Sequence, residues 1–326
     1  MSARLSDYDY HLPRELIAQR PAERRDDSRM MVLNRVTQTI DHRQFRELRT
    51  FLQQGDLLAL NNTRVLSARR FSDDGAIEFL FLERLSPRRW RCLVTPGRKM
   101  RVGATTTIDG VTLCVEEITP DGERVVVLNA DTDLYSGGSM PLPPYIRRDN
   151  DADDARRYQT VFAQAPGALA APTAGLHFTP EILSEIPHTF VTLHVGTGTF
   201  LPVRSENISE HRMHAERFSI SGAAAARINE ARRIVAVGTT VVRVLEAARR
   251  NDGKLVAQEG FTDIFIYPPF RFQAVDVLLT NFHLPRSTLL MLVSAFAGRE
   301  FLLRAYEEAI REGYRFYSYG DCMLIL

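Results

Sequence analysis

The chain has 326 residues, of which 44% are hydrophobic and 25% charged, and its formal net charge at pH 7 is +1. These values are typical of a folded globular protein and exclude a disordered or fibrous chain. The longest apolar run, residues 287–297, is much shorter than the roughly 20 residues that a membrane helix needs. The N-terminus carries acidic residues and lacks the apolar region of a secretion signal. We therefore expect a cytoplasmic protein without a membrane span.

The cysteines and basic residues restrict the possibilities further. The three cysteines are far apart and odd in number, so neither a disulfide framework nor a zinc site is expected. Of the 41 basic residues, Lys99 and Lys254 are the lysines, which leaves 39 arginines. The planar guanidinium group suits phosphates better than an ammonium group does. A genome-wide preference for arginine would explain the same composition equally well.

Residues 1–67 are predicted to form the first part of an α/β domain. An extended arm over residues 7–13 leads into one helical turn over residues 15–20. Short strands mixed with a helix then follow, as expected for an α/β layer. The predicted elements are strand 29–34, helix 45–52 and buried strand 56–60.

Residues 68–148 are predicted to form a small antiparallel β-barrel. Five or six β-rich runs follow one another without a helix. The pairs Asp109-Gly110 and Asp121-Gly122 between them are strong signals for hairpin turns. Consecutive hairpins favour a barrel that is closed or half-closed. A proline-stiffened connector over residues 140–148 would end it.

Residues 149–326 return to α/β structure, in which predicted strands alternate with predicted helices. The sequence therefore predicts a large α/β domain, with a first part over residues 1–67 and a second over 149–326, interrupted by an inserted barrel over 68–148. A monomer is the default expectation. The strands are expected at residues 189–195, 234–237, 261–267 and 275–279, and the helices at 222–233, 241–250, 288–297 and 300–312.

Five histidines are candidates for a small-molecule site. Four of them gather in residues 171–216 beside short glycine turns, and the fifth follows a predicted buried strand. Because ligands bind at the carboxyl ends of strands in open α/β sheets, histidines in such positions predict a pocket there. Histidines that only brace a turn or pack are the alternative. The candidates are His177, His194, His211, His214 and His283.

Two short motifs in this region favour no cofactor. Residues 196–198, Gly-Thr-Gly after a strand, lack the third glycine of a dinucleotide fingerprint, and Pro202 does not open a helix. His211 and His214, with Glu216 beyond them, have metal-ligand chemistry but no HExxH pattern or cysteine partner. Neither a Rossmann phosphate site nor a metal is therefore expected.

Thr239 and Thr240 follow Gly238 at the start of a predicted helix. The free N–H groups and the dipole of a helix start favour an anion or a carboxylate. An ordinary threonine cap would produce the same pattern.

Residues 84–101 contain seven basic residues and no acidic one, with Trp90 among them. Arginines beside an aromatic side chain suit RNA with exposed bases. A solvated face of the barrel is the alternative interpretation.

Several long strings of the sequence resemble, in order, the S-adenosylmethionine:tRNA ribosyltransferase-isomerase family of queuosine synthesis. The likeness runs from Asp7 to the C-terminus. The chain departs from the family's pattern at Pro269-Phe270, where a glycine-aromatic pair is expected, and at Cys322, where alanine is common. The strings include YDYHLPRELIAQRP, GDLLALNNTRVL, MPLPPYI, RYQTVFA, APTAGLHF, TLHVGTGTFLPV, HRMHAE, VGTTVVRVLE, FTDIFIYP, TNFHLPRSTLLMLVSAFAG and YRFYSYGD.

The resemblance implies a large α/β domain with an inserted β-barrel, and a transferase and isomerase activity. Family members transfer and isomerise the ribosyl group of S-adenosylmethionine onto the aminomethyl-deazaguanine (prequeuosine) base at the wobble position of a tRNA. The product is epoxyqueuosine, and adenine and methionine are released. S-adenosylmethionine is a co-substrate, and no prosthetic group or metal is implied.

The residues fit this chemistry, because its proton transfers call for groups that titrate near neutral pH, as histidine does. We expect the five histidines to line the pocket, one as base and one as the acid that protonates adenine. The residues expected to contact S-adenosylmethionine are Thr173, Gly175, Gly196, Gly198, Thr199, Thr239, Thr240 and Asn281. The residues expected to contact tRNA, in a cleft between barrel and α/β domain, are Arg64, Arg69, Arg98, Lys99, Arg147 and Arg148.

Two other functions stay open from the sequence. One is a non-catalytic RNA-binding protein, in which the barrel binds RNA and the histidines are structural. The other is an S-adenosylmethionine-dependent RNA methyltransferase. No glycine-rich strand-loop-helix opens the α/β region, as that fold would require.

Overall fold

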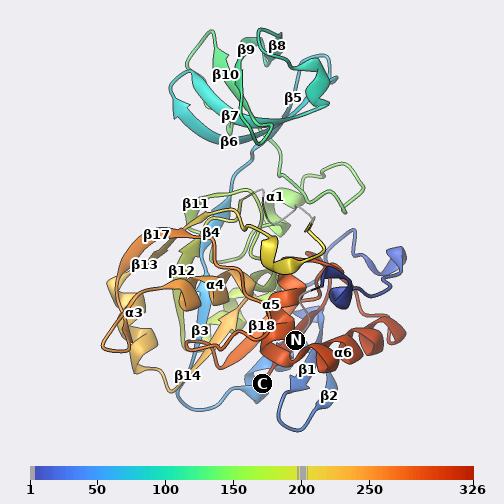
Figure 1. Ribbon diagram of the computed structural model, residues 1–326, viewed down its shortest axis with the longest axis vertical. Coiled ribbons are helices and arrows are strands. Elements are labelled where there is room, and N and C mark those ends of the chain that lie inside the picture. The colour runs from blue at the N-terminus through green and yellow to red at the C-terminus, as the bar shows by residue number, and fades with distance from the viewer. Residues whose placement is uncertain (1–3, 197, 199–202, 204) are drawn as a thin grey trace. The chain divides into compact units, whose positions relative to one another are not determined.

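The structure is a computed structural model that describes residues 4–196, 198, 203 and 205–326. The chain divides into two compact units (Figure 1). The larger unit comprises Met1–Arg64, Pro143–Arg148 and Arg157–Leu326, and the smaller unit comprises Val65–Leu142 and Asp149–Arg156.

A nine-stranded mixed sheet forms the centre of the larger unit, in the order β17-β13-β12-β3-β14-β18-β19-β1-β2. Neighbours within β12-β3-β14-β18 pair in parallel, as do β19 and β1. The remaining neighbours are antiparallel. The strands are β1 Arg29–Asn34, β2 Thr39–Gln44, β3 Asp56–Asn61, β12 His188–Leu193, β13 Glu216–Ile220, β14 Arg233–Val237, β17 Gln258–Thr262, β18 Val277–Asn281 and β19 Cys322–Ile325.

The central strands are buried on both faces, as expected for parallel strands covered on each side. Side chains alternate between two hydrophobic cores along each strand. In β3, for example, Leu57 and Ala59 belong to one core, whereas Leu58 and Leu60 belong to the other. A shift of one residue in the pairing would exchange the two sets, so the two cores specify the register of the sheet.

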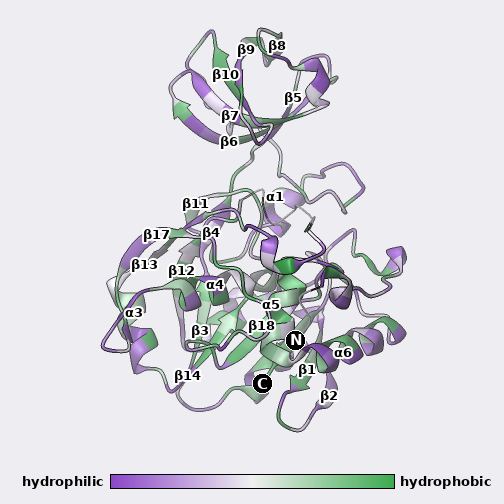
Figure 2. Ribbon diagram, in the orientation of Figure 1, coloured by the Kyte–Doolittle hydropathy of each residue, from purple (hydrophilic) through white to green (hydrophobic). Residues whose placement is uncertain are grey.

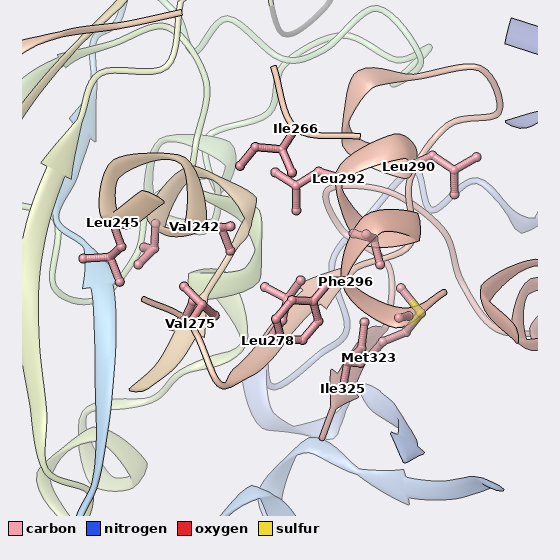
Figure 3. Packing of buried hydrophobic residues seen from close by; sticks show 14 of the residues in the cluster. Val242, Leu245, Ile266, Val275, Leu278, Leu290, Leu292, Phe296, Met323 and Ile325 are labelled. Atoms are coloured by element: carbon pink, nitrogen blue, oxygen red, sulfur yellow. The ribbon is translucent and has the colours of Figure 1, made fainter. Parts of the chain in front are cut away.

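Helices cover the first of these cores, and Figure 3 shows side chains of α4 and α5 packed together over the sheet. Ser287 accepts a hydrogen bond from the Leu290 amide at the start of α5, and Gly298 ends it with a φ of 88°. Figure 2 shows α5 as mainly hydrophobic and α6 as mixed, in agreement with their buried residues. The helices of this unit are α2 Pro180–Ser184, α3 Gly222–Glu230, α4 Thr239–Ala247, α5 Thr288–Ala297 and α6 Arg299–Arg311.

In the described part of the chain, short 3-10 helices, two small strand pairs and α1 (Asp154–Arg157) make up the other elements of regular structure outside the two large sheets and the helices named above. The strand pairs are β4 (Thr63–Val65) with β11 (Ala165–Ala168) and β15 (Arg250–Asn251) with β16 (Lys254–Leu255). The 3-10 helices are Leu5–Tyr8, Arg14–Leu16, Arg25–Asp27, Phe45–Phe51, Gly97–Lys99, Thr173–His177 and Ile208–Glu210.

The smaller unit is a curled antiparallel sheet of six strands, in the order β5-β6-β7-β10-β9-β8. Its core contains Phe79, Phe81 and Trp90, which are fully buried. The Asp73 amide, just after β5, donates to the Thr107 carbonyl of β8 at 2.9 Å, so the two sheet edges approach each other at one end. The strands are β5 Arg69–Phe71, β6 Glu78–Ser86, β7 Arg89–Thr95, β8 Thr105–Ile108, β9 Val111–Ile118 and β10 Arg124–Leu128.

Mixed α/β structure with a curled antiparallel sheet was predicted and is confirmed, but three local predictions were wrong or incomplete. The strand expected at 261–267 is β17, which ends at Thr262 because its partner β13 begins at Glu216, opposite Thr262. The helix expected at 45–52 is a 3-10 helix. Strand β19 was not predicted, although it lies between β18 and β1.

Candidate active site

A pocket in the larger unit lies at the carboxyl ends of the parallel strands. Val195 follows β12, Gly238 follows β14 and Phe282 follows β18, and all three line it. The pocket holds about 1010 Å³ of empty space, including open solvent at its mouth. This position is the usual ligand site of open α/β sheets.

Three tyrosines, Tyr145, Tyr158 and Tyr317, line this pocket. The rings of Tyr145 and Tyr317 are 4.7 Å apart, and the Tyr145 hydroxyl lies 2.6 Å from the Ser318 hydroxyl. Tyr317 has a φ of 71°, in the left-handed region that a tyrosine rarely adopts. Backbone outliers of this kind cluster at functional sites. Tyr145 and Tyr317, whose rings are tilted by 43° to each other, give this wall of the pocket an aromatic surface against which a ring-shaped ligand can pack.

Asn281, at the end of β18, has a buried polar atom without a partner. Its side chain is 2% exposed, and its amide group donates to the Tyr317 carbonyl at 3.0 Å. The same nitrogen lies 3.3 Å from Nε2 of His177. Within the described chain, Oδ1 of Asn281 has no hydrogen-bond partner. A buried acceptor usually has one, so this oxygen is available to a donor group of a ligand.

The N-terminus of α4 also lines the pocket. Gly238, with a φ of 92°, precedes the helix without a side-chain cap, and Thr239 and Thr240 form its first turn. Such a helix start presents backbone N–H groups and a positive dipole end, which favour a carboxylate.

Arg243, one turn further along α4, forms an ion pair with Glu216 that the sequence analysis missed. Both side chains are 5% exposed, and Arg243 lines the pocket. Glu216 also accepts the Gly196 amide at 3.0 Å. The arginine in the otherwise apolar string VVRVLE was the signal, because a buried charge requires a partner.

His283 is the histidine that lines this pocket, while His177 lines a smaller one beside it. Nε2 of His283 lies 2.9 Å from the Thr280 hydroxyl, and burial lowers the pKa of His283 to about 3. Burial, followed by the charge of Arg25, lowers the pKa of His177 to about 4. Both imidazoles are therefore neutral at pH 7.

The other three candidate histidines lie outside both pockets. Nδ1 of His194 is 2.8 Å from the Thr63 hydroxyl, and burial, followed by the charge of Arg217, lowers the pKa of His194. The His211 ring packs on Phe265 at 5.3 Å, and its pKa is lowered by burial and then by His214. His214 is exposed.

The remaining candidate ligand residues are partly brought together. Thr173, Thr239, Thr240 and Asn281 line the larger pocket. Glycines at the other positions allow close packing: a Cβ at Gly175 would lie 2.8 Å from Phe162, and one at Gly198 would lie 2.8 Å from His214. Gly196 binds Glu216 through its amide. Thr199 lies outside the described residues.

The basic residues predicted to contact RNA differ in whether their side chains are exposed or bonded within the protein. Arg64, Arg98, Lys99 and Arg147 are exposed. Arg69 forms an ion pair with Glu78 at 2.6 Å, and Arg148 donates to the Gln19 carbonyl at 3.0 Å.

The basic stretch 84–101 is less available to RNA than the sequence indicated. Arg84, Arg89 and Arg91 form ion pairs with acidic residues on other parts of the smaller unit. Trp90 is fully buried, so it cannot stack on a base. The stretch is basic, as its composition indicates, but side chains alternate between the two faces of β7, and Trp90 lies on the face that is buried.

Two searches of the described residues gave negative results. His, Cys, Asp and Glu side chains nowhere form a group of three or more that could hold a metal ion. Every helix in the described part of the chain is too short or too polar to span a membrane.

A pocket with aromatic side chains and a helix N-terminus in its wall, at the carboxyl ends of parallel strands, defines a ligand-binding α/β protein. The sequence matches the family described as "Queuosine biosynthesis protein" over residues 5–325. It is 50% identical to the S-adenosylmethionine:tRNA ribosyltransferase-isomerase of Carboxydothermus hydrogenoformans, covering 99% of this chain and 100% of that one. It is 51% identical to the protein of the same name from Heliobacterium modesticaldum, covering 98% of each.

A solved structure is similar as well. The crystal structure of S-adenosylmethionine tRNA ribosyltransferase from Thermotoga maritima is 41% identical, covers 98% of this chain and 100% of its own, and has a TM-score of 0.57. The chain belongs to the S-adenosylmethionine:tRNA ribosyltransferase-isomerase family of queuosine biosynthesis, a family of transferases and isomerases. Membership does not favour the two alternatives, a non-catalytic RNA-binding protein and a methyltransferase.

Proposed function

We propose that this chain transfers and isomerises the ribosyl group of S-adenosylmethionine onto the prequeuosine base at the wobble position of a tRNA. Epoxyqueuosine forms in the tRNA, and adenine and methionine are released. The observation that carries the proposal is the pocket at the carboxyl ends of β12, β14 and β18, in a chain that matches the family over residues 5–325.

The pocket supplies a partner for each part of S-adenosylmethionine. The methionine carboxylate binds at the start of α4, where Thr239 and Thr240 present their N–H groups. The adenine ring stacks on the tyrosine wall, and the unpaired Oδ1 of Asn281 accepts a hydrogen bond from an N–H group of the ligand. Arg243 adds no net charge beside the sulfonium, because Glu216 neutralises it.

We assign the proton exchange with the bound ligand to His283, because it is the one of the five candidate histidines that lines the larger pocket. The sulfonium acidifies the neighbouring ribose carbon, so a base removes a proton there before adenine leaves and the neutral amine of the tRNA base attacks. The imidazole of His283 is neutral at pH 7 and can accept a proton, but the burial that lowers its pKa also makes it a weaker base than a free imidazole. His177 acts on the pocket through Asn281 as a positioning residue. The assignments of His194, His211 and His214 remain predictions.

We further propose that the curled sheet is a domain inserted into the α/β domain and that exposed basic residues hold the tRNA backbone. Arg64, Arg98, Lys99 and Arg147 are free to contact phosphates. The wobble base leaves the anticodon loop to reach the pocket, as in base extrusion. A cytoplasmic location and a monomeric state are expected on the same grounds as before.

One assay tests the function. The protein is incubated with S-adenosylmethionine and tRNA that carries the precursor base, and free adenine and methionine are measured. A methyltransferase would release S-adenosylhomocysteine instead, and a binding protein would release nothing. The variant His283→Asn should lower turnover by about 10²-fold or more. His188, whose ring lies 2.8 Å from the Ile186 carbonyl away from this pocket, gives the matched control His188→Gln.

A further inference from the structure

A second, smaller pocket lies beside the first in the larger unit, with about 260 Å³ of empty space. We call it the arginine pocket, because it is lined by Arg24, Arg25 and Arg157, and the described residues of its wall include no carboxylate. Ser28 and His177 also line it. A concave wall with several guanidinium groups is chemistry that binds oxyanions.

Arg157 carries a donor that its protein partners do not use. Its two terminal nitrogens donate to the carbonyls of Ala22 and Glu23, at 2.6 and 3.0 Å. Both partners are neutral, so the charge of Arg157 is not cancelled by them. Its Nε is buried and has no hydrogen-bond partner among the described residues. An unsatisfied charged donor at a pocket wall is a group that an anion would satisfy.

The larger pocket and the arginine pocket have side chains in common or in contact across the wall between them. Ser318 lines both, and its hydroxyl lies 2.6 Å from that of Tyr145 in the larger pocket. His177 contacts Ser28 on one side, at 2.9 Å, and Asn281 of the larger pocket on the other. The two pockets are therefore neighbours that share part of a wall.

We propose that the arginine pocket binds an oxyanion, and that this anion is a backbone phosphate of the RNA strand whose base enters the larger pocket. The inference rests on the function proposed above. The other oxyanion of the reaction, the methionine carboxylate, already has a partner in the start of α4, which lines the larger pocket. A phosphodiester oxygen can accept from the unused Nε of Arg157, and the positive charges of Arg25 and Arg157, whose terminal nitrogens donate to neutral carbonyls, favour its negative charge.

The test uses Arg24→Gln and Arg157→Gln in the full chain, with Arg49→Gln as the matched control. The side chains of Arg24 and Arg49 are 71% and 69% exposed, and each pairs with one carboxylate, of Asp26 and Glu185. We expect each pocket variant to weaken tRNA binding about tenfold and to lower the slope of log K against log salt by about one. The KM for S-adenosylmethionine should not change. The control should behave like the unsubstituted protein.

Two outcomes would overturn the proposal. A higher KM for S-adenosylmethionine with unchanged tRNA binding would assign the pocket to the methionine carboxylate. Unchanged values for both substrates would make the arginines structural. Because Arg157 also holds two carbonyls, thermal unfolding is measured for each variant, and Arg24→Gln decides the matter if Arg157→Gln unfolds early.

A calorimetric titration with inorganic phosphate separates this proposal from the proposed function. The unsubstituted protein should bind phosphate and Arg24→Gln should bind it several-fold more weakly, whether or not adenine release is observed. Equal phosphate binding by both proteins would reject the arginine pocket. Absence of adenine release from the unsubstituted protein would reject the function and leave the phosphate result standing.

Discussion

Acidification from pH 7 to pH 5 should destabilise the protein through two buried histidines. His177 and His283 are 3% and 8% exposed, and their pKa values in the folded chain are about 4 and about 3. In the unfolded chain each has a pKa of about 6.5. Below that value the unfolded chain binds more protons than the folded chain, so stability falls as the pH falls from 6.5 towards the folded pKa.

The magnitude follows from these values. At pH 5, which is roughly 1.5 units below the pKa of about 6.5 in the unfolded chain, protonation stabilises the unfolded state by about 2 kcal/mol per histidine, while the folded imidazole stays mostly neutral. The two together should lower the free energy of unfolding by about 4 kcal/mol. Burial is the main cause in both cases, and the described hydrogen-bond partners of the two imidazoles are hydroxyl and amide groups, not carboxylates.

Urea unfolding at pH 5, 6 and 7 measures this difference. The variants His177→Asn and His283→Asn should each reduce the loss between pH 7 and pH 5 by about 2 kcal/mol. Ser294→Ala is the control, because Ser294 is 1% exposed and does not titrate, so it should lower stability equally at every pH. A loss that persists unchanged in both histidine variants would refute the reasoning.

Three further substitutions probe the larger pocket. Glu216→Gln should lower the free energy of unfolding, measured in urea, by about 3–5 kcal/mol, because it leaves Arg243 buried without its partner. Adding Arg243→Met should restore part of this loss. An effect of Glu216→Gln below about 1 kcal/mol would contradict the prediction. Tyr317→Ala should raise the KM for S-adenosylmethionine by the equivalent of roughly 1–3 kcal/mol of lost stacking. Tyr317→Phe keeps the ring, so its KM should stay near that of the unsubstituted protein. Equal effects of the two variants would show that the hydroxyl matters and the ring does not. Asn281→Leu should raise the same KM about tenfold, since a buried hydrogen-bonding group is lost, and an unchanged KM would remove Asn281 from the site.

The sequence by itself determined the elements whose signals are local. Helix α5 spans Thr288–Ala297, the range predicted from the sequence, between the cap residues Ser287 and Gly298. The hairpin at Asp109-Gly110 joins β8 to β9, as expected from the turn residues. The long ordered likeness to one family also indicated the activity class, because it depends only on the order of residues. Caps and turns act over a few residues, so a short stretch contains their whole cause.

The strands and side-chain contacts whose partners lie far away in the sequence were decided by the tertiary structure alone. Strand β19 at the C-terminus exists because it pairs with β1 and β18, and its short sequence shows no such partner. Glu216 and Arg243 are 27 residues apart in the sequence, and His177 and Ser28 are 149 apart, yet both pairs are in contact. The five histidines looked alike in sequence, yet packing placed His283 in the larger pocket and His177 in the arginine pocket, and left the others elsewhere. Burial and pairing across the sheet, which set these positions and their pKa values, are properties of the folded chain as a whole.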